Sequence, residues 1–171
     1  MAEQNDNVWA PWRMQYIESL DKDEDAGGCF LCRYASTPDA DRENHVLIRS
    51  ERTLVLLNRF PYTNGHLLVA PAAHVADPLD LPEDVLFELS RRLCDAKRVL
   101  DRVLTPQGYN LGMNLGRCGG AGLPEHLHWH IVPRWGGDTN YMSVVADVRV
   151  IPQSLDELHK RFLDAATQLG V

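Results

Sequence analysis

The sequence predicts an α+β fold: a mostly antiparallel sheet with one long helix and a C-terminal helix. β-rich segments separated by turn residues occupy much of 46–71, and a helical period follows from Asp80 to Val103. Two more strand-like segments, 108–116 and 126–132, come after this helix. Several strands with hairpin-like turns around one long helix favour this fold class.

Composition and charge suit one soluble domain. The 171 residues are 44% hydrophobic and 24% charged, which suits burial of roughly 70% of the unfolded surface. No apolar run approaches the roughly 18 residues of a membrane span, and the start, MAEQNDNVW, is polar and acidic, unlike a secretory signal. We therefore expect a cytoplasmic protein without a membrane partner. The net charge of −7 argues against broad nucleic-acid binding, although a locally basic site can still hold a small anion.

The N-terminal region is expected to precede the main domain as an appendage. VWAPWRMQYIESL (8–20) is an aromatic arm in which Trp9, Trp12 and Tyr16 offer a packing face, and DKDEDAGG (21–28) is an acidic hinge. The predicted divisions of the chain are the arm and hinge at 1–28, the main domain at 29–150 and the C-terminal helix at 151–171.

The middle of the chain predicts three strands and a hairpin turn. VLIRS (46–50), TLVLLN (53–58) and HLLVAP (66–71) are β-branched and aliphatic, which is typical of buried strands. FPYTNG (60–65) lies between the last two and carries Pro and Asn-Gly, both strong turn signals.

Two helices are predicted in the second half of the chain. Pro82 suits a first helical turn, and the segment from Pro106 to Gly108 ends the helix. Between them, apolar residues recur at helical spacing: Val85, Leu86, Leu89, Leu93, Ala96, Val99, Leu100 and Val103. Near the end of the chain, Ser154 and Glu157 form a capping box that starts a last helix at roughly 154–168.

Three histidines alternate with apolar residues in EHLHWHIVPRW (125–135). On a helix His126 and His130 would share a face while His128 pointed away, whereas on a strand all three line one face. The β-rich spacers and the terminating Pro133 favour the strand. GYNLGMNLG (108–116), an alternating strand-like segment, and the glycine-rich loop GRCGGAGLP (116–124) come just before it.

Three uses of this histidine row compete. The histidines could be structural, satisfied by neighbours or water, but three in register on one face disfavour that interpretation. They could form a three-histidine metal site of the kind found in zinc hydrolases. They could also support nucleophilic catalysis, in which a neutral imidazole attacks an electrophile while its neighbours stabilise the charge.

The pattern His126-Leu-His128-Trp-His130-Ile-Val resembles the signature of the histidine-triad (HIT) family of nucleotidyl hydrolases and transferases. LLNRFPYTNGHLLVAPAAHV (56–75) is similar to the family's nucleoside-binding hairpin, and the resemblance covers roughly 45–150. VWAPWRMQYI and PRWGGDTNYMSV look most like bacterial HIT proteins that split diadenosine tetraphosphate by phosphorolysis or hydrolysis. The resemblance implies a HIT-like fold with a five-stranded sheet. It also implies a homodimer formed through the long helix and a sheet edge.

The resemblance assigns catalytic roles to His128, His130 and His66. The middle histidine of the triad, here His128, is the family's nucleophile, and its Nε2 needs a lone pair while a backbone carbonyl holds the proton on Nδ1. It attacks the α-phosphorus of a dinucleoside polyphosphate to give a nucleotidyl-histidine, which water or phosphate then resolves. His130 and the loop amides would hydrogen-bond the phosphoryl oxygens, with His66 supporting them.

Further residues are expected to contact the nucleotide. Asn58 matches the family asparagine that binds the ribose hydroxyls, although a turn-capping role suits it equally well. Arg134 could steer polyphosphate into an acidic protein, or it could be a solvated surface arginine. The residues expected to bind nucleotide are Asn58, Asn114, Gly120, Gly122 and Arg134.

Cys29-x-x-Cys32 indicates metal or redox chemistry before it indicates a structural disulfide. Some HIT relatives, such as the galactose-phosphate uridylyltransferases, complete a zinc site with a histidine after the hairpin and the first triad histidine. The resemblance therefore implies a structural zinc ion bound by Cys29, Cys32, His74 and His126, with no open coordination position. The alternative is two reduced cysteines packed as small hydrophobic residues, with His74 at the surface.

One position departs from other branches of the family. They carry a glutamine that reaches the phosphates four residues before the first histidine, where this chain has Gly122. The choice between water and phosphate as acceptor therefore stays open. Two other functions also stay open: a nucleoside 5′-phosphoramidase, and a non-catalytic, zinc-stabilised nucleotide-binding protein. An unrelated three-histidine metallohydrolase is disfavoured because the hairpin and the loop would then be coincidences.

Overall fold

The computed structural model describes residues 28–140, 142 and 150–171, so the predicted aromatic arm and most of the acidic hinge lie outside the described residues. The elements in chain order are α2 (Phe30–Ser36), η1 (Pro38–Ala40), β1 (Val46–Arg49), β2 (Thr53–Leu57), β3 (Leu67–Pro71), η2 (Pro78–Asp80), α3 (Glu83–Leu104), β4 (Gly108–Met113), β5 (Trp129–Arg134) and α5 (Leu155–Leu169).

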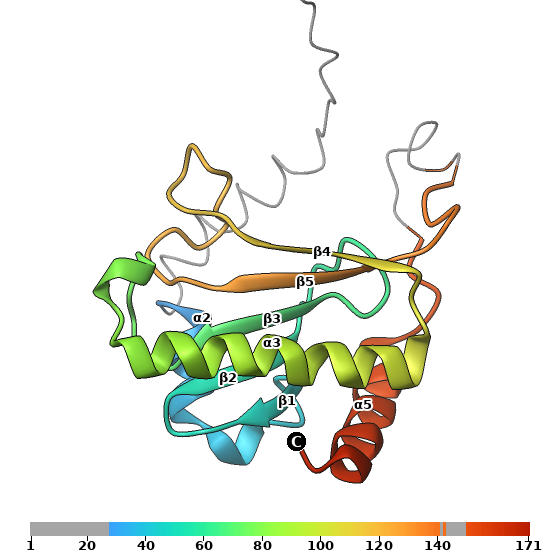
Figure 1. Cartoon of the computed structure of the whole chain (residues 1–171), viewed down its shortest axis with the longest axis horizontal. Coiled ribbons are helices and arrows are strands. Elements are labelled where there is room, and N and C mark those ends of the chain that lie inside the picture. Colours follow the sequence, from blue (N-terminus) through green and yellow to red (C-terminus); the bar gives the residue numbers. More distant parts are fainter. Residues whose placement is uncertain (1–27, 141, 143–149) are drawn as a thin grey trace, which may run out of the picture.

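A single five-stranded sheet organises these elements. Its strand order is β1-β2-β3-β5-β4, and each neighbouring pair is antiparallel. β5 comes last among the strands in the sequence but lies between β3 and β4, as Figure 1 shows. The predicted α+β fold is confirmed, and β5, the strand that carries His130, lies inside the sheet.

The two faces of the sheet pack against different helices. On one face, Val55, Val69 and Ile131 join residues of α3 and α5 in one hydrophobic cluster, and Figure 1 shows α3 running across the sheet. On the other face, Leu68 and Ala70 pack with residues of the short helix α2. This division follows from the alternation of side chains along each strand.

Both predicted helices are present, with small shifts at their ends. Pro82 is the N-cap of α3 rather than part of its first turn, and Thr105 ends the helix in a left-handed conformation. The side chain of Ser154 accepts a hydrogen bond from the backbone N–H of Glu157 at 3.3 Å, so the predicted cap of α5 is confirmed. Among the described residues, no helix is long and apolar enough to cross a membrane.

The predicted hairpin turn closes between β2 and β3. The backbone N–H of Asn58 donates to the carbonyl of His66 at 2.9 Å. Gly65 has a φ of +81°, and a Cβ at this position would collide with Leu104 of α3. The positive φ favours glycine here, and a Cβ would in addition require the Leu104 side chain to move.

The predicted boundaries of the histidine strand are wrong at both ends. β5 begins at Trp129, so His126 and His128 precede it. The segment that carries them is held by a hydrogen bond of 2.6 Å from the N–H of Leu127 to the carbonyl of Val75. The alternation nevertheless persists, because Leu127 joins the cluster on the α3 face. Pro133 lies inside β5 rather than ending it. β3 pairs with β5 only as far as Ile131, so Pro133 has a strand on one side only, where proline is tolerated.

Candidate active site and metal centre

His128 is held by the backbone of its own segment. Its Nδ1 lies 2.9 Å from the carbonyl oxygen of His126, and the side chain is buried at 7% exposure. Because a carbonyl can only accept, Nδ1 carries the proton and Nε2 keeps its lone pair. Burial lowers the pKa of His128, opposed by the hydrogen bond to His126. The ring is therefore held neutral, in the tautomer that a nucleophilic imidazole needs.

His130 lies beside His128 and contacts a fourth histidine. The rings of His128 and His130 meet edge to face with centroids 4.9 Å apart. Nδ1 of His130 lies 3.0 Å from Nε2 of His66, which is fully buried in the hairpin. His66, His128 and His130 are thus brought together, as the resemblance implied.

Tyr62 completes this group, although no pattern in the sequence singled it out. Its ring stacks on His130 with centroids 5.9 Å apart and an interplanar angle of 21°. The Tyr62 ring also packs against the ring of His66, with centroids 4.7 Å apart. Tyr62 lies in the FPYTNG turn, where Pro and Asn-Gly predicted only a change of direction. The fold around the triad was needed to place its ring.

Asn58 braces the same turn. Its side-chain oxygen accepts the N–H of Phe60 at 2.9 Å, and its Nδ2 lies 3.2 Å from Nδ1 of His66. These contacts fit the turn-capping role that was open at the sequence level. A ribose contact by Asn58 remains a prediction.

The glycine-rich loop is held by the amide of Asn114, which donates to the carbonyl of Gly120 at 3.2 Å. Gly120 itself has a φ of +83°. Gly119, which the sequence analysis did not single out, lies so near the carbonyl oxygen of Leu115 that a Cβ would overlap it. Gly122 lies further along the same loop. Contacts of Asn114, Gly120 and Gly122 with a nucleotide remain predictions.

A cavity of about 1020 Å³ extends from His130 along β5 and β4, and among its described lining residues His130 is the only member of the triad. His130, Tyr62 and Arg134 are among its lining residues, and so is Trp135, which the sequence analysis used only as a subfamily marker. Arg134 donates to Asp138 and to the side-chain oxygen of Asn110. Arg134 lowers the pKa of Asp138 to about 2, so the two charges largely offset each other. Steering of polyphosphate by Arg134 therefore remains a prediction.

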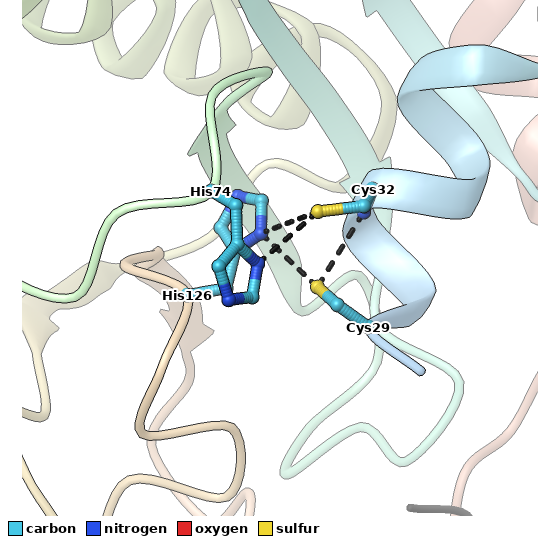
Figure 2. A group of neighbouring side chains, drawn as sticks. All are labelled: Cys29, Cys32, His74 and His126. Atoms are coloured by element: carbon cyan, nitrogen blue, oxygen red, sulfur yellow. Dashed lines mark hydrogen bonds between the residues drawn. The ribbon is translucent and has the colours of Figure 1, made fainter. Parts of the chain in front are cut away.

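A second cluster lies at the opposite end of the histidine segment. Figure 2 shows Cys29 and Cys32, at the start of α2, pointing toward His74 and His126. The four possible ligand atoms lie within 4.8 Å of one another. Nδ1 of His126 is 3.1 Å from Sγ of Cys29 and 3.5 Å from Sγ of Cys32, while Nδ1 of His74 is 3.2 Å from Sγ of Cys32.

These donors fit a tetrahedral metal ion. Zn–S and Zn–N bonds of about 2.3 and 2.05 Å place sulfur and nitrogen about 3.6 Å apart, close to the separations seen here. Nε2 of His126 lies 2.9 Å from the carbonyl of Pro71, so Nε2 donates and Nδ1 presents its lone pair to the sulfurs. The structure thus contains a possible Cys/His metal site with its buried histidine in the tautomer that ligation requires.

The protonation of these groups couples to metal binding. Burial, with a smaller effect from Cys29, raises the pKa of the Cys32 thiol to about 11. Burial also lowers the pKa of His126 to about 4, opposed by its hydrogen bond to Pro71 and reinforced by His74 and His128. His126 is therefore already neutral, whereas the thiol has to lose its proton to a cation. Metal binding at this site should release protons.

Comparison with known proteins identifies what the chain resembles. A model of the HIT domain matches residues 40–137. An AP-4-A phosphorylase from Mycobacterium tuberculosis is 35% identical over 161 residues, covering 92% of this chain and 83% of that protein. Among solved structures, a Zn-bound histidine triad family protein from Mycobacterium smegmatis has a TM-score of 0.67 at 26% identity, covering 84% of this chain and 96% of the other. A hypothetical histidine triad nucleotide-binding protein from Sulfolobus tokodaii has a TM-score of 0.66 at 26% identity, covering 82% and 93%.

Proposed function

The chain belongs to the HIT-domain family, and on that premise we propose that this enzyme cleaves dinucleoside polyphosphates through a covalent nucleotidyl-histidine. The substrate class follows the relative named AP-4-A phosphorylase, which aligns with most of the chain. The observation that supports the chemistry best is the hydrogen bond from Nδ1 of His128 to the carbonyl of His126. It leaves a lone pair on Nε2 of a neutral, buried imidazole.

In the first step, Nε2 of His128 attacks the α-phosphorus of diadenosine tetraphosphate. A P–N bond forms, the bond from the α-phosphorus to the bridging oxygen breaks, and ATP leaves. Negative charge grows on the phosphoryl oxygens in the transition state. His130 and the amides of the glycine-rich loop hydrogen-bond these oxygens, and His66 supports His130 from within the hairpin.

In the second step, we propose that inorganic phosphate is the acceptor. A phosphate oxygen attacks the phosphorus of the adenylyl-histidine, the P–N bond breaks, and ADP leaves with His128 restored. The named activity of the Mycobacterium tuberculosis relative supports phosphate over water. Gly122 stands where other branches of the family carry a glutamine, so this position offers no side chain to the phosphates.

We also propose that the Cys/His cluster binds zinc in a structural role. A set of two thiolates and two imidazoles suits Zn²⁺ and leaves no open coordination position. The ion would tie the start of α2 to the segment that carries His128. Cysteine ligands of this kind require reducing conditions, which supports a cytoplasmic location.

The assembly that we propose is a homodimer. Among the described strands, β4 pairs only with β5, so its other edge is open for a second copy. Leu111 on this strand is 54% exposed and Leu115, just beyond its end, is 44% exposed, so apolar side chains adjoin the open edge. Light scattering or sedimentation of the purified protein would test this assembly.

The decisive experiment is incubation of the protein with diadenosine tetraphosphate, with and without inorganic phosphate. Phosphorolysis gives ADP plus ATP and depends on phosphate. AMP plus ATP without phosphate would show water as the acceptor, with the same covalent step. Two ADP molecules would contradict attack at the α-phosphorus, and the absence of any product would overturn the proposed activity.

A further inference from the structure

The hydrogen bond between His66 and His130 does not by itself say which ring donates. Each neutral imidazole has one N–H and one lone pair, and either nitrogen of the pair could carry the proton. The answer matters because it decides whether His130 presents an N–H or a lone pair at its other nitrogen. Only an N–H on Nε2 can stabilise an anionic phosphoryl oxygen.

The backbone of the hairpin turn resolves this choice. The N–H of Tyr62 lies 3.1 Å from Nδ1 of His66. A backbone amide can only donate, so Nδ1 of His66 must accept and its proton must reside on Nε2. Nε2 of His66 then donates to Nδ1 of His130 across 3.0 Å. The proton of His130 is consequently on Nε2.

Asn58 strengthens the same assignment. Its side-chain oxygen accepts the N–H of Phe60, which fixes the orientation of the amide and turns the NH₂ group toward His66. Nδ1 of His66 therefore faces two donors, one from the backbone and one from a side chain. Since His66 is fully buried, solvent does not compete for this nitrogen.

We propose that Tyr62, through its backbone amide, and Asn58 are positioning residues that fix His130 as an Nε2–H donor. Neighbouring histidines then present opposite groups: His128 a lone pair and His130 an N–H. The hairpin sets one tautomer and the carbonyl of His126 sets the other. The proposal rests on the proposed function for its catalytic meaning, but the tautomers themselves can be measured without substrate.

The first test reads the tautomers directly. In protein labelled with ¹⁵N-histidine, long-range ¹H–¹⁵N spectra recorded well above the usual histidine pKa distinguish Nδ1–H from Nε2–H rings. His66→Gln, His128→Gln and His130→Gln variants assign the signals. We expect Nε2–H for His66 and His130 and Nδ1–H for His128. An Nδ1–H tautomer at His130 in the unmodified protein overturns the proposal, whatever the enzyme cleaves.

The second test uses a matched pair at one position. Tyr62→Ala removes the ring but keeps the backbone N–H, whereas Tyr62→Pro removes both. We expect the proline variant to show mixed tautomers at His66 and His130. Its single-turnover rate of histidine adenylylation should be about tenfold to a hundredfold below that of the alanine variant, because losing one donor to a developing oxyanion costs roughly that much or more. Equal tautomers and equal rates in the two variants contradict the proposal.

Asn58 offers a test that does not depend on folding of the proline variant. Asn58→Leu keeps the approximate shape of the side chain but removes both its donor to His66 and its acceptor for the N–H of Phe60. A positioning role lowers the adenylylation rate and shifts the His66 signals while leaving KM nearly unchanged. A ribose contact alone would instead raise KM without altering the histidine spectrum, and that result would remove Asn58 from the proposal.

Discussion

His128 and His130 are two residues apart, yet their surroundings differ in a way that decides their chemistry. His128 donates to a carbonyl within its own segment, whereas His130 receives its hydrogen bond from His66 in the hairpin. Removal of each side chain should therefore impair the reaction in a different way. One supplies the atom that forms a bond, and the other stabilises charge.

We expect His128→Ala to abolish both turnover and covalent adenylylation without unfolding the protein. His130→Ala should still form the intermediate, at a rate about 10²–10³ lower, since it loses one donor to the phosphoryl group. The P–N bond of the intermediate is hydrolysed in acid. The adenylylated protein should therefore be measured by intact mass spectrometry at neutral pH. Adenylylation of the His128→Ala variant at a normal rate would refute the assignment of the nucleophile.

At this scale the sequence predicted the histidine face, and the family resemblance implied the Nδ1 proton of His128. The proton positions of His126, His66 and His130 were not predicted. Alternation alone put His126, His128 and His130 on one side. The tautomers depend on partners distant in the chain, such as the carbonyl of Pro71 and the N–H of Tyr62. Backbone groups carry no residue-specific signal, so their contacts could not be predicted from the sequence.

Among the larger elements, the glycine-rich loop before β5 depends on a close backbone approach. A Cβ on Gly119 would overlap the carbonyl oxygen of Leu115, which cannot move aside as a flexible side chain can. We expect Gly119→Ala to displace the loop amides and lower the adenylylation rate at least tenfold, because those amides stabilise the phosphoryl group. Gly108→Ala, with open space around the new Cβ, is the control. Equal rates in the two variants would show that the loop does not contribute.

The Cys/His cluster connects the start of α2 to the segment that carries His128. On the proposal that it binds zinc, removal of the metal should affect stability as well as activity. A ligand at about 1,000 times its Kd stabilises a protein by about 4 kcal/mol, which corresponds to roughly 8–16 °C in Tm for a chain of this size. We expect chelation, or Cys32→Ser, to lower Tm by an amount of that order. Cys94→Ser, at an exposed cysteine outside the cluster, is the control. An unchanged Tm after metal loss, verified by elemental analysis, would remove the structural role.

Element boundaries show where sequence patterns stop being informative. Pro133 was predicted to end the histidine strand, but β5 continues to Arg134 because only β4 pairs with it there. The zinc ligand set came from a family resemblance, and the spacing Cys29-x-x-Cys32 alone could not show which histidines complete it. Convergence of His74 and His126 required the hairpin and the sheet order.

On the scale of the whole molecule, the C-terminal helix α5 packs against the first strand, β1. Nε2 of His159 on α5 donates to the carbonyl of Val46 at 2.8 Å, and the ring packs edge to face on His45 with centroids 5.4 Å apart. His45 in turn contacts Asp156 at 2.8 Å. His159 had no motif around it in the sequence, and only the packing of α5 reveals that it is 3% exposed.

This contact makes the stability of the whole fold depend on pH. Burial lowers the pKa of His159 below its usual 6.5, opposed by the hydrogen bond to Val46 and reinforced by His45. The unfolded chain therefore binds a proton more readily than the folded one, so the stabilisation is complete above the usual pKa and is lost as the pH falls below it. We expect the free energy of unfolding in urea to decrease from about pH 7.5 to about pH 5.5. Glutamine in the His159→Gln variant keeps a donor for the carbonyl of Val46 but does not titrate. The free energy of unfolding of this variant should therefore decrease less over the same pH range. Since His126 and His128 are the same in both proteins, the difference in slope reports His159 together with its interaction with His45, and identical slopes would contradict the prediction.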